Sequence, residues 1–146
     1  MKIFIASDHA GFKLKNQIKN FLQDNDFVVY DLGPMQYNPK DDYSDYAKKL
    51  AEKMKNEKDT KGILICSSGV GVCIAANKFS YIRAFNAFNS KLAAVSRKED
   101  NTNVICFGQK FVSFKKAKKI LKVWLKTKFS NKERHKRRLK KIKNYD

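Results

Sequence analysis

The sequence lacks the long apolar run that a membrane-spanning helix needs. No stretch approaches the roughly 20 uninterrupted apolar residues that cross a bilayer, and the apolar start, residues 1–6, leads directly into Ser7, Asp8 and His9. We therefore expect neither a membrane span nor a signal peptide. Cysteine is also scarce, and its three copies show no paired spacing, which suits a reducing, cytoplasmic location.

Acidic residues are few as well. The 146 residues include 14 Asp and Glu against 32 Lys and Arg, for a net charge of +18. Most of the excess lies in residues 115–146, where Glu133 and Asp146 are the only acids. Such a segment suits a nucleic acid, an acidic partner or a phosphorylated substrate, and it is equally typical of a solvated helical face. The aromatic residues do not alternate with the basic ones as on an RNA-binding surface, so a nucleic acid is the less favoured partner.

Proline is almost absent, and both copies, Pro34 and Pro39, fall in one loop. No internal repeat or low-complexity linker interrupts the chain. An apolar content of 42% over this length is enough to bury one core. We therefore predict a single domain over residues 1–146, which includes a basic helical segment at about 114–143.

What the chain does have is an alternation of short apolar runs with helical patterns. The expected strands are 3–6, 27–31, 63–66, 82–86 and 104–107. The helices expected between them lie at about 10–24, 43–57, 71–79 and 89–98. This order, with strands apolar on both faces, is typical of an α/β fold with a parallel sheet covered by helices on each side. Right-handed crossovers then bring every strand-to-helix loop to the carboxyl edge of the sheet, where such folds bind ligands.

Two more helices are expected after the last strand. An apolar stripe beneath the lysines predicts a helix at about 114–127. The final segment, about 131–143, carries Leu139 and Ile142 as its apolar residues. So thin a stripe indicates a helix that docks by an edge or against another chain.

Three polar segments, 7–11, 66–71 and 86–89, should meet at the carboxyl edge. Asp8 and His9 fall at a predicted helix start, which favours anions, although Asp8 can also be a simple N-cap. Residues 66–71, Cys-Ser-Ser-Gly-Val-Gly, lack the third glycine of a dinucleotide fingerprint, the lysine of a Walker loop and the arginine of a Cys-x5-Arg phosphatase loop. What remains is a loop whose N–H groups can hold an anion or a developing oxyanion, with Cys66 at its lip.

The other cysteines and the histidines carry weaker signals. Cys73 falls inside a predicted helix and Cys106 inside a predicted strand, so both are interpreted as core residues. Cys66 and Cys73 have no metal-ligand spacing and no nearby histidine, so no metal site is predicted. His9 and His135 lie beside charged residues, which favours contact with a ligand over burial.

Together these motifs resemble the ribose-5-phosphate isomerase B family, which also includes galactose-6-phosphate and allose-6-phosphate isomerases. The matching stretches follow the family's order from residue 2 to about residue 142. They are Asp8-His9-Ala10-Gly11-Phe12-x-Leu14-Lys15, Asp42-Tyr43, Gly62-Ile63-Leu64-Ile65-Cys66, Ser68-Gly69-x-Gly71, Ile74-Ala75-Ala76-Asn77-Lys78, Ile82-Arg83-Ala84, Thr102-Asn103-Val104 and Arg134-His135-x-x-Arg138.

The resemblance implies a three-layer αβα sandwich with a five-stranded, Rossmann-like parallel sheet, and active sites completed across a homodimer. Whether such dimers pair into tetramers stays open. It also implies interconversion of D-ribose 5-phosphate and D-ribulose 5-phosphate through a cis-enediolate, without metal or organic cofactor. Cys66 matches the thiol that moves the proton between C2 and C1. The implied substrate contacts are the loop residues Ser67, Ser68, Gly69, Val70 and Gly71, the sugar contacts Asp8 and Tyr43, and the phosphate contacts His9, Arg134 and Arg138. Lys110 is a smaller departure, since many relatives carry an arginine at this place near the phosphate, and we expect it to be a substrate contact as well.

One stretch departs from the family pattern. Glu99 stands where the family has the histidine that opens the furanose ring, and Asp100 stands where it has an asparagine. We expect Glu99 to be the second catalytic residue and Asp100 a substrate contact. The sequence leaves three alternatives: a six-carbon substrate such as allose 6-phosphate, a relative weakened at Glu99, or a nucleic-acid-binding protein that uses the basic tail.

Overall fold

The computed structural model describes residues 1–145 and consists of strands that alternate with helices. The strands are β1 (Lys2–Ser7), β2 (Val28–Asp31), β3 (Thr60–Cys66), β4 (Ala84–Asn86) and β5 (Val104–Gly108). The helices are the 3-10 turn η1 (His9–Gly11), α1 (Phe12–Gln23), α2 (Tyr43–Met54), α3 (Val70–Ala76), α4 (Ser90–Asp100), α5 (Phe114–Lys126) and α6 (Glu133–Lys143). Every strand and helix predicted above is confirmed, with ends that differ by a few residues. No helix among residues 1–145 is long and apolar enough to cross a membrane.

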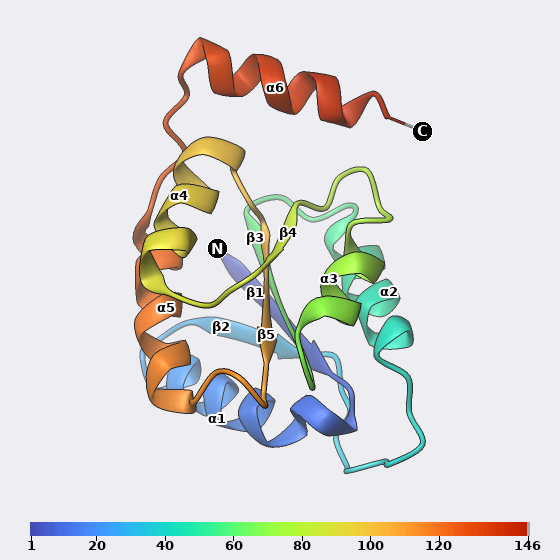
Figure 1. Cartoon of the computed structure of the whole chain (residues 1–146). Coiled ribbons are helices and arrows are strands. Elements are labelled where there is room, and N and C mark those ends of the chain that lie inside the picture. Colours follow the sequence, from blue (N-terminus) through green and yellow to red (C-terminus); the bar gives the residue numbers. More distant parts are fainter. Residues whose placement is uncertain (146) are drawn as a thin grey trace.

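The five strands form one parallel sheet in the order β2-β1-β3-β5-β4 (Figure 1). The register places Lys2 of β1 opposite Val28 of β2 and Thr60 of β3, so these three strands start level with one another. Because all strands run the same way, every strand-to-helix loop emerges at the carboxyl edge, and every helix returns the chain to the amino edge. The predicted α/β fold is confirmed.

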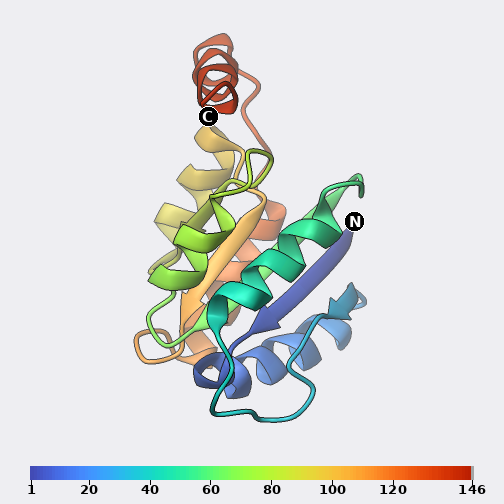
Figure 2. The same ribbon diagram turned by 90° about the vertical axis from the view of Figure 1, so that its right-hand side faces the viewer.

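Two apolar layers fill the space between the sheet and its helices, one on each face. Strand β3 shows the division, because Ile63 and Ile65 lie in one layer and Leu64 and Cys66 in the other. This alternation is the period of two that a strand imposes. Helices α1, α4 and α5 contribute to the first layer, and α2 and α3 contribute to the second (Figure 1, and Figure 2 from the side). The predicted αβα sandwich is therefore confirmed.

Local sequence explains where α4 and α5, the helices that follow β4 and β5, begin. The Asn89 side chain accepts a hydrogen bond from the Leu92 N–H at 2.8 Å, and the Ser113 hydroxyl accepts one from the Lys116 N–H at 3.2 Å. Both side chains satisfy N–H groups that the first turn of a helix leaves unpaired. The predicted stripe of α5 faces the core through Ala117, Ile120, Leu121 and Trp124.

Helix α6 lies apart from the sandwich, at the amino edge of the sheet and beyond the end of α4 (Figure 1). The segment before it is tied to α4, because the Ser130 N–H donates to the Lys98 carbonyl oxygen at 3.0 Å. Within residues 133–143 only His135 is buried, and its Nδ1 lies 2.6 Å from the Ser130 hydroxyl. The expectation that His135 avoids burial is therefore wrong, since this contact fixes the start of α6.

Candidate active site

The Cys66 thiol lies at the end of β3, enclosed by the loop that follows it. Its Sγ accepts a hydrogen bond from the Gly69 N–H at 3.1 Å, and the residue is 3% exposed. The loop can turn back this tightly because Gly69 has a φ of +79°, where a side chain would be strained. A Cβ there would also lie 2.9 Å from the backbone nitrogen of Gly108. The chain geometry therefore directs an amide N–H at the sulfur.

The 66–71 loop is held by the ends of the neighbouring strands. The side chain of Asn86, the last residue of β4, donates to the Ser68 carbonyl oxygen at 3.1 Å. The Lys110 N–H after β5 donates to the Ser67 carbonyl oxygen at 3.1 Å. The Ser68 hydroxyl accepts from the Val70 N–H at 3.2 Å. The loops predicted to meet at the carboxyl edge do meet there.

Tyr43 stands against this loop although it comes from a different helix. It is the first residue of α2, and its ring lies so close to Gly71 that a Cβ on Gly71 would come within 2.6 Å of a ring carbon. The residue is 43% exposed. An exposed phenol beside the 66–71 loop is a suitable contact for a hydroxylated ligand.

Asp8 lies one strand away from Cys66. Its N–H donates to the carbonyl oxygen of Ile65 at 3.3 Å, and its Oδ1 accepts from the Gly11 N–H at 3.1 Å. The N-cap role is therefore real. Burial raises the pKa of the Asp8 carboxyl, although the Gly11 N–H and the His9 ring act in the opposite direction. The side chain thus combines a structural role with a place beside the thiol-bearing strand.

His9 lines a cavity of about 340 Å³ together with Lys13, Ser67 and Lys110. Phe12, Tyr37 and Gln109 also contribute to its wall. Two lysines and a histidine around one small cavity are suited to binding an anion such as phosphate. Three predicted site residues, His9, Ser67 and Lys110, are brought together here.

Sequence reasoning missed three residues of this region: Asp41, Lys13 and Gln109. Asp41 Oδ1 accepts hydrogen bonds from both the backbone N–H and the ring Nδ1 of His9, at 2.9 and 2.8 Å. Gln109 accepts a hydrogen bond from the Leu14 N–H at 2.8 Å. The acidic run at 41–42 was a visible signal for Asp41, but its partner is 32 residues away in the chain.

Four predicted site residues lie elsewhere. Glu99 and Asp100 end helix α4, and Arg134 and Arg138 are exposed on α6. All four are at the amino edge of the sheet, so one copy of the chain does not bring them to Cys66 (Figure 1). This follows from the topology, because a crossover helix that starts at the carboxyl edge must end at the amino edge.

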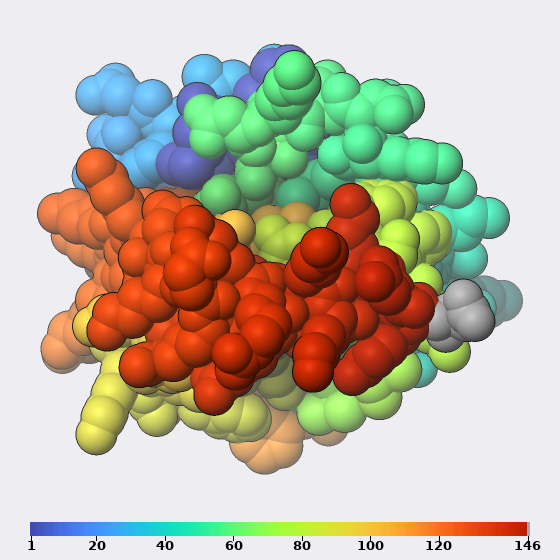
Figure 3. All heavy atoms as spheres, turned by 90° about the horizontal axis from the view of Figure 1, so that it is seen from above, coloured from blue at the N-terminus to red at the C-terminus, as the bar shows by residue number. Residues whose placement is uncertain are grey.

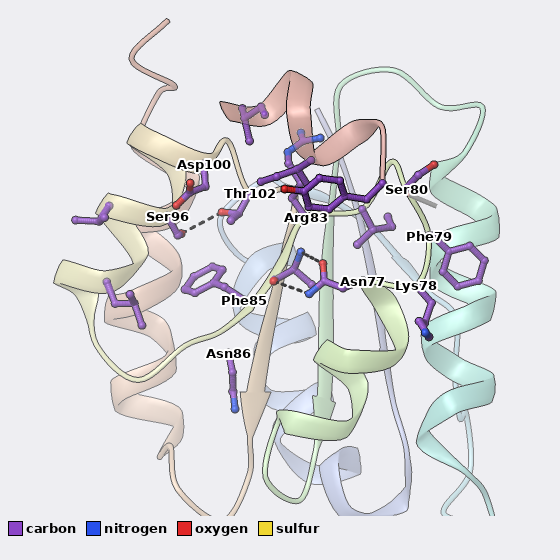
Figure 4. A pocket seen from close by; sticks show the side chains of 17 residues that line it. Asn77, Lys78, Phe79, Ser80, Arg83, Phe85, Asn86, Ser96, Asp100 and Thr102 are labelled. Carbon is purple, nitrogen blue, oxygen red and sulfur yellow. Dashed lines mark hydrogen bonds between the residues drawn. The ribbon is translucent and has the colours of Figure 1, made fainter. Parts of the chain in front are cut away.

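A larger cavity of about 870 Å³ lies along β4, from Asn86 at the carboxyl end of that strand to α6 at the amino edge, and Asp100 contributes to it. Figure 4 shows its walls, formed by Phe85 and the end of α3 on the sheet side and roofed by α6. Its apolar lining residues are Phe79, Ile82, Ala84, Phe85, Leu92, Val95, Leu139 and Ile142. Seen from above, α6 lies across this end of the molecule (Figure 3). Leu92 and Val95 are each 40% exposed and Ile142 is 50% exposed, so much of this apolar surface is open.

Metal ligands do not gather in either region. Among residues 1–145 no group of three or more His, Cys, Asp or Glu side chains could hold a metal ion. The groups that the carboxyl edge brings together, a thiol with amide and cationic groups, are suited to acid–base chemistry and to stabilising negative charge.

Comparisons with known proteins agree with this geometry. The model of the Ribose/Galactose Isomerase family matches residues 3–142. The crystal structure of ribose-5-phosphate isomerase B from Mycoplasma genitalium, with bound ribulose-5-phosphate, is 45% identical, covers 99% of this chain and 95% of that one, and has a TM-score of 0.94. Ribose-5-phosphate isomerase B from Clostridium thermocellum is 40% identical, with 98% and 95% covered and a TM-score of 0.93.

A relative with a different printed activity also matches. The D-erythrulose-4-phosphate isomerase of Pectobacterium atrosepticum is 37% identical over 131 residues, which cover 88% of this chain and 85% of that protein. The family match spans nearly the whole chain, and the resemblance drawn from the motifs is confirmed. The chain belongs to the Ribose/Galactose Isomerase family.

Proposed function

We propose that this protein is an enzyme, an aldose–ketose isomerase that interconverts D-ribose 5-phosphate and D-ribulose 5-phosphate. The observation that carries the proposal is the Cys66 thiol, which receives the Gly69 N–H beside a small cationic cavity. Similarity over nearly the full length to a protein solved with ribulose-5-phosphate supports the same substrate class.

The proton transfer is assigned to Cys66. As a thiolate it removes the proton from C2 of the open-chain aldose, and the electron pair forms the C1=C2 bond of an enediolate with charge on O1. The proton then returns to C1 while the O2 hydroxyl proton passes to O1, which yields the ketose. The Gly69 N–H stabilises negative charge on the sulfur, and the other amides of the 67–71 loop are suited to the enediolate oxygen.

The phosphate is assigned to the cavity lined by His9 and Lys110. Binding the phosphate away from C1 and C2 holds the sugar in register and supplies binding energy that lowers the barrier at the reacting carbons. Asp8 and Tyr43 then flank the sugar from either side of the loop, as contacts to its hydroxyl groups.

The rest of the site is assigned to a second copy of the chain, in a homodimer. Glu99 and Asp100 with Arg134 and Arg138 of the partner subunit would approach the carboxyl edge, with Glu99 opening the furanose ring and the arginines binding the phosphate. The open apolar cavity at the amino edge supports this arrangement, since Leu92, Val95 and Ile142 are otherwise left partly in water. The free state of all three cysteines supports a cytoplasmic location.

A substrate panel tests the activity. The purified protein is assayed with D-ribose 5-phosphate, D-allose 6-phosphate and the four-carbon D-erythrulose 4-phosphate, and we expect the highest kcat/KM with the pentose. A higher value with either other sugar moves the proposal to that substrate. Retention of DNA or RNA on a filter at physiological salt, with no isomerase activity, would instead support the basic tail as a nucleic-acid surface.

Mixing two inactive variants tests the shared site. Cys66→Ala removes the base, and Arg134→Ala with Arg138→Ala removes the groups assigned to the partner. When the two are co-expressed in equal amounts, random pairing gives mixed dimers that keep one intact site each, so about a quarter of the wild-type activity should return. Each variant alone is the control. No recovery would show that the two halves act within one chain.

A further inference from the structure

Asp41 contacts His9 twice through one carboxylate oxygen. A single oxygen, Oδ1, accepts the His9 backbone N–H at 2.9 Å and the ring Nδ1 at 2.8 Å. The Asp41 side chain is 7% exposed, whereas the His9 side chain is 33% exposed on the side of the cavity. The carboxylate is thus enclosed, and the ring it holds is open to a ligand.

This contact settles the role of each ring nitrogen. A carboxylate is only an acceptor, so Nδ1 must carry a hydrogen. Nε2 is then the ring atom left for a ligand, and His9 lines the same cavity as Lys13 and Lys110. If Nε2 is also protonated, the ring presents an N–H and a positive charge to that cavity.

The loop that carries Asp41 is held at its start by a buried lysine and forms a turn near its end. At its start the buried Lys15 ammonium donates to the Pro34 carbonyl oxygen at 2.6 Å and pairs with Asp31 at 2.8 Å. Near its end the Asp41 N–H donates to the Asn38 carbonyl oxygen at 3.3 Å. Between them, Tyr37 packs edge-on against the His9 ring, with centroids 6.2 Å apart.

The charges around His9 favour its cation. The hydrogen bond that the His9 ring donates to Asp41 is the largest cause that raises the pKa of His9, and the charge of Asp8 acts in the same direction. Burial alone would raise the pKa of Asp41, but the backbone and ring hydrogen bonds from His9 bring it below its ordinary value. Burial and the adjacent Asp41 raise the pKa of Tyr46 to about 12, so this phenol stays neutral. Lys13 and Lys110 face the cavity and act against a further positive charge.

We propose that Asp41 is a positioning residue that keeps His9 doubly protonated, with Nδ1–H bound to the carboxylate and Nε2–H available to a phosphate dianion. The inference rests on the proposed function in that it takes the substrate to be a sugar phosphate. Asp41 acts through His9 and does not touch the substrate, so its contribution should appear in binding and in the pH at which binding is lost.

The direction of the pH effect follows from the raised pKa of His9. Below that pKa the ring is a cation and KM stays low. As the pH rises through it, the charge is lost and KM increases. Asp41→Asn keeps an oxygen that can accept both His9 N–H groups but removes the negative charge, so the rise in KM should begin at a lower pH. Asp41→Ala also removes the hydrogen bonds that orient the His9 ring, so it should raise KM more than Asp41→Asn does.

The experiment combines kinetics with ring NMR on the full-length protein. In Asp41→Asn, at a pH between the His9 pKa of the variant and that of the wild type, we expect KM for ribose 5-phosphate to rise about 5- to 10-fold, the difference between a charge-assisted and a neutral hydrogen bond, with kcat nearly unchanged. Asp45→Asn is the matched control, because Asp45 is exposed in the first turn of α2 and its substitution removes the same charge. Its kinetics should match the wild type.

The NMR arm separates this inference from the proposed function. The chain has two histidines, so their ring signals are readily assigned with a His9→Gln variant. The His9 signal should titrate at lower pH in Asp41→Asn, and inorganic phosphate should perturb it more weakly than in the wild type. This result without any isomerase activity would refute the proposed function and leave the inference intact. A His9 titration that Asp41→Asn does not move, or an unchanged KM at every pH, overturns the inference.

Discussion

The two edges of the sheet differ in the size of their cavities and in the side chains that line them. The carboxyl edge is polar and closely hydrogen-bonded, and its cavity of about 340 Å³ gathers Ser67, His9 and two lysines. The cavity of about 870 Å³ lies below an exposed helix and is lined by apolar side chains such as Phe85, Leu92 and Ile142 together with polar ones such as Asn77, Arg83 and Asp100. The first region resembles a preformed binding site for a small anion. The second resembles a protein interface that no partner covers.

In the proposed function, this difference means that one copy of the chain carries complementary halves of a site at opposite ends. The carboxyl edge supplies a thiol and loop amides, and the amino edge supplies the carboxylates of Glu99 and Asp100 and the guanidinium groups of Arg134 and Arg138. The sheet lies between them, so no small movement within one chain can join the halves. In the proposed homodimer, association of two copies would cover the apolar part of the cavity and would unite the two halves.

The largest effect is expected from removing the thiol at the carboxyl edge. Cys66→Ala should lower kcat by about 100-fold or more, the range for loss of a general base, while a phosphorylated inhibitor still binds. Steady-state kinetics and calorimetric titration of the inhibitor measure the two effects. Cys73→Ala is the control, since Cys73 is half-buried in α3 and has no assigned role in the reaction. Near-normal turnover in Cys66→Ala would remove the thiol from the mechanism.

The next effect concerns the arginines of the amino edge. Arg138→Ala should raise KM for the sugar phosphate by about 10- to 100-fold, because a charge-assisted hydrogen bond of roughly 1.5–3 kcal/mol is lost. The comparison variant replaces Lys140, Lys141 and Lys143 with alanine, and exposed lysines of this kind should change KM little. A lysine variant with the higher KM would invert the distinction between site arginines and solvated lysines.

The apolar half of the amino edge offers a third test. Ile142→Asp should weaken the dimer about 10- to 100-fold for each copy, since burying an Ile side chain contributes roughly 1.5–3 kcal/mol. Sedimentation across a concentration series measures this, and activity should return as the dimer re-forms at high concentration. Lys140→Asp is the control, because Lys140 is exposed on α6 outside the cavity lining. A dimer indifferent to Ile142→Asp would locate the interface elsewhere.

The smallest effect is expected at Glu99. Histidine donates and accepts protons near neutral pH, whereas a glutamic acid ordinarily titrates at about 4.3, so ring opening should improve with an imidazole. Glu99→His should therefore raise turnover of ribose 5-phosphate a few-fold, and raise turnover of the open-chain ribulose 5-phosphate less. Initial rates in both directions provide the comparison. Equal effects in the two directions would place Glu99 outside ring opening.

Part of the site was predictable because it depends on strand ends and handedness. Once β1 and β3 are recognised as parallel neighbours, Asp8 and Cys66 must emerge at the same edge, and the structure ties them through Ile65. The same rule places Glu99, at the end of a crossover helix, on the opposite edge. The position of Glu99 could therefore be inferred from the sequence. Family motifs alone do not show which of their residues lie together in one copy of the chain.

The helices, the strands and their order follow from local patterns in the sequence. Apolar alternation along strands, stripes along helices and caps such as Asn89 and Ser113 act within a few residues, so they can be read locally. Tertiary structure alone decided that Asp41 holds His9 and that His135 is buried beneath the turn before α6. Those contacts depend on the path of a loop and on the packing of a helix end. Residue type and spacing do not show which distant group will be the hydrogen-bond partner of a buried side chain.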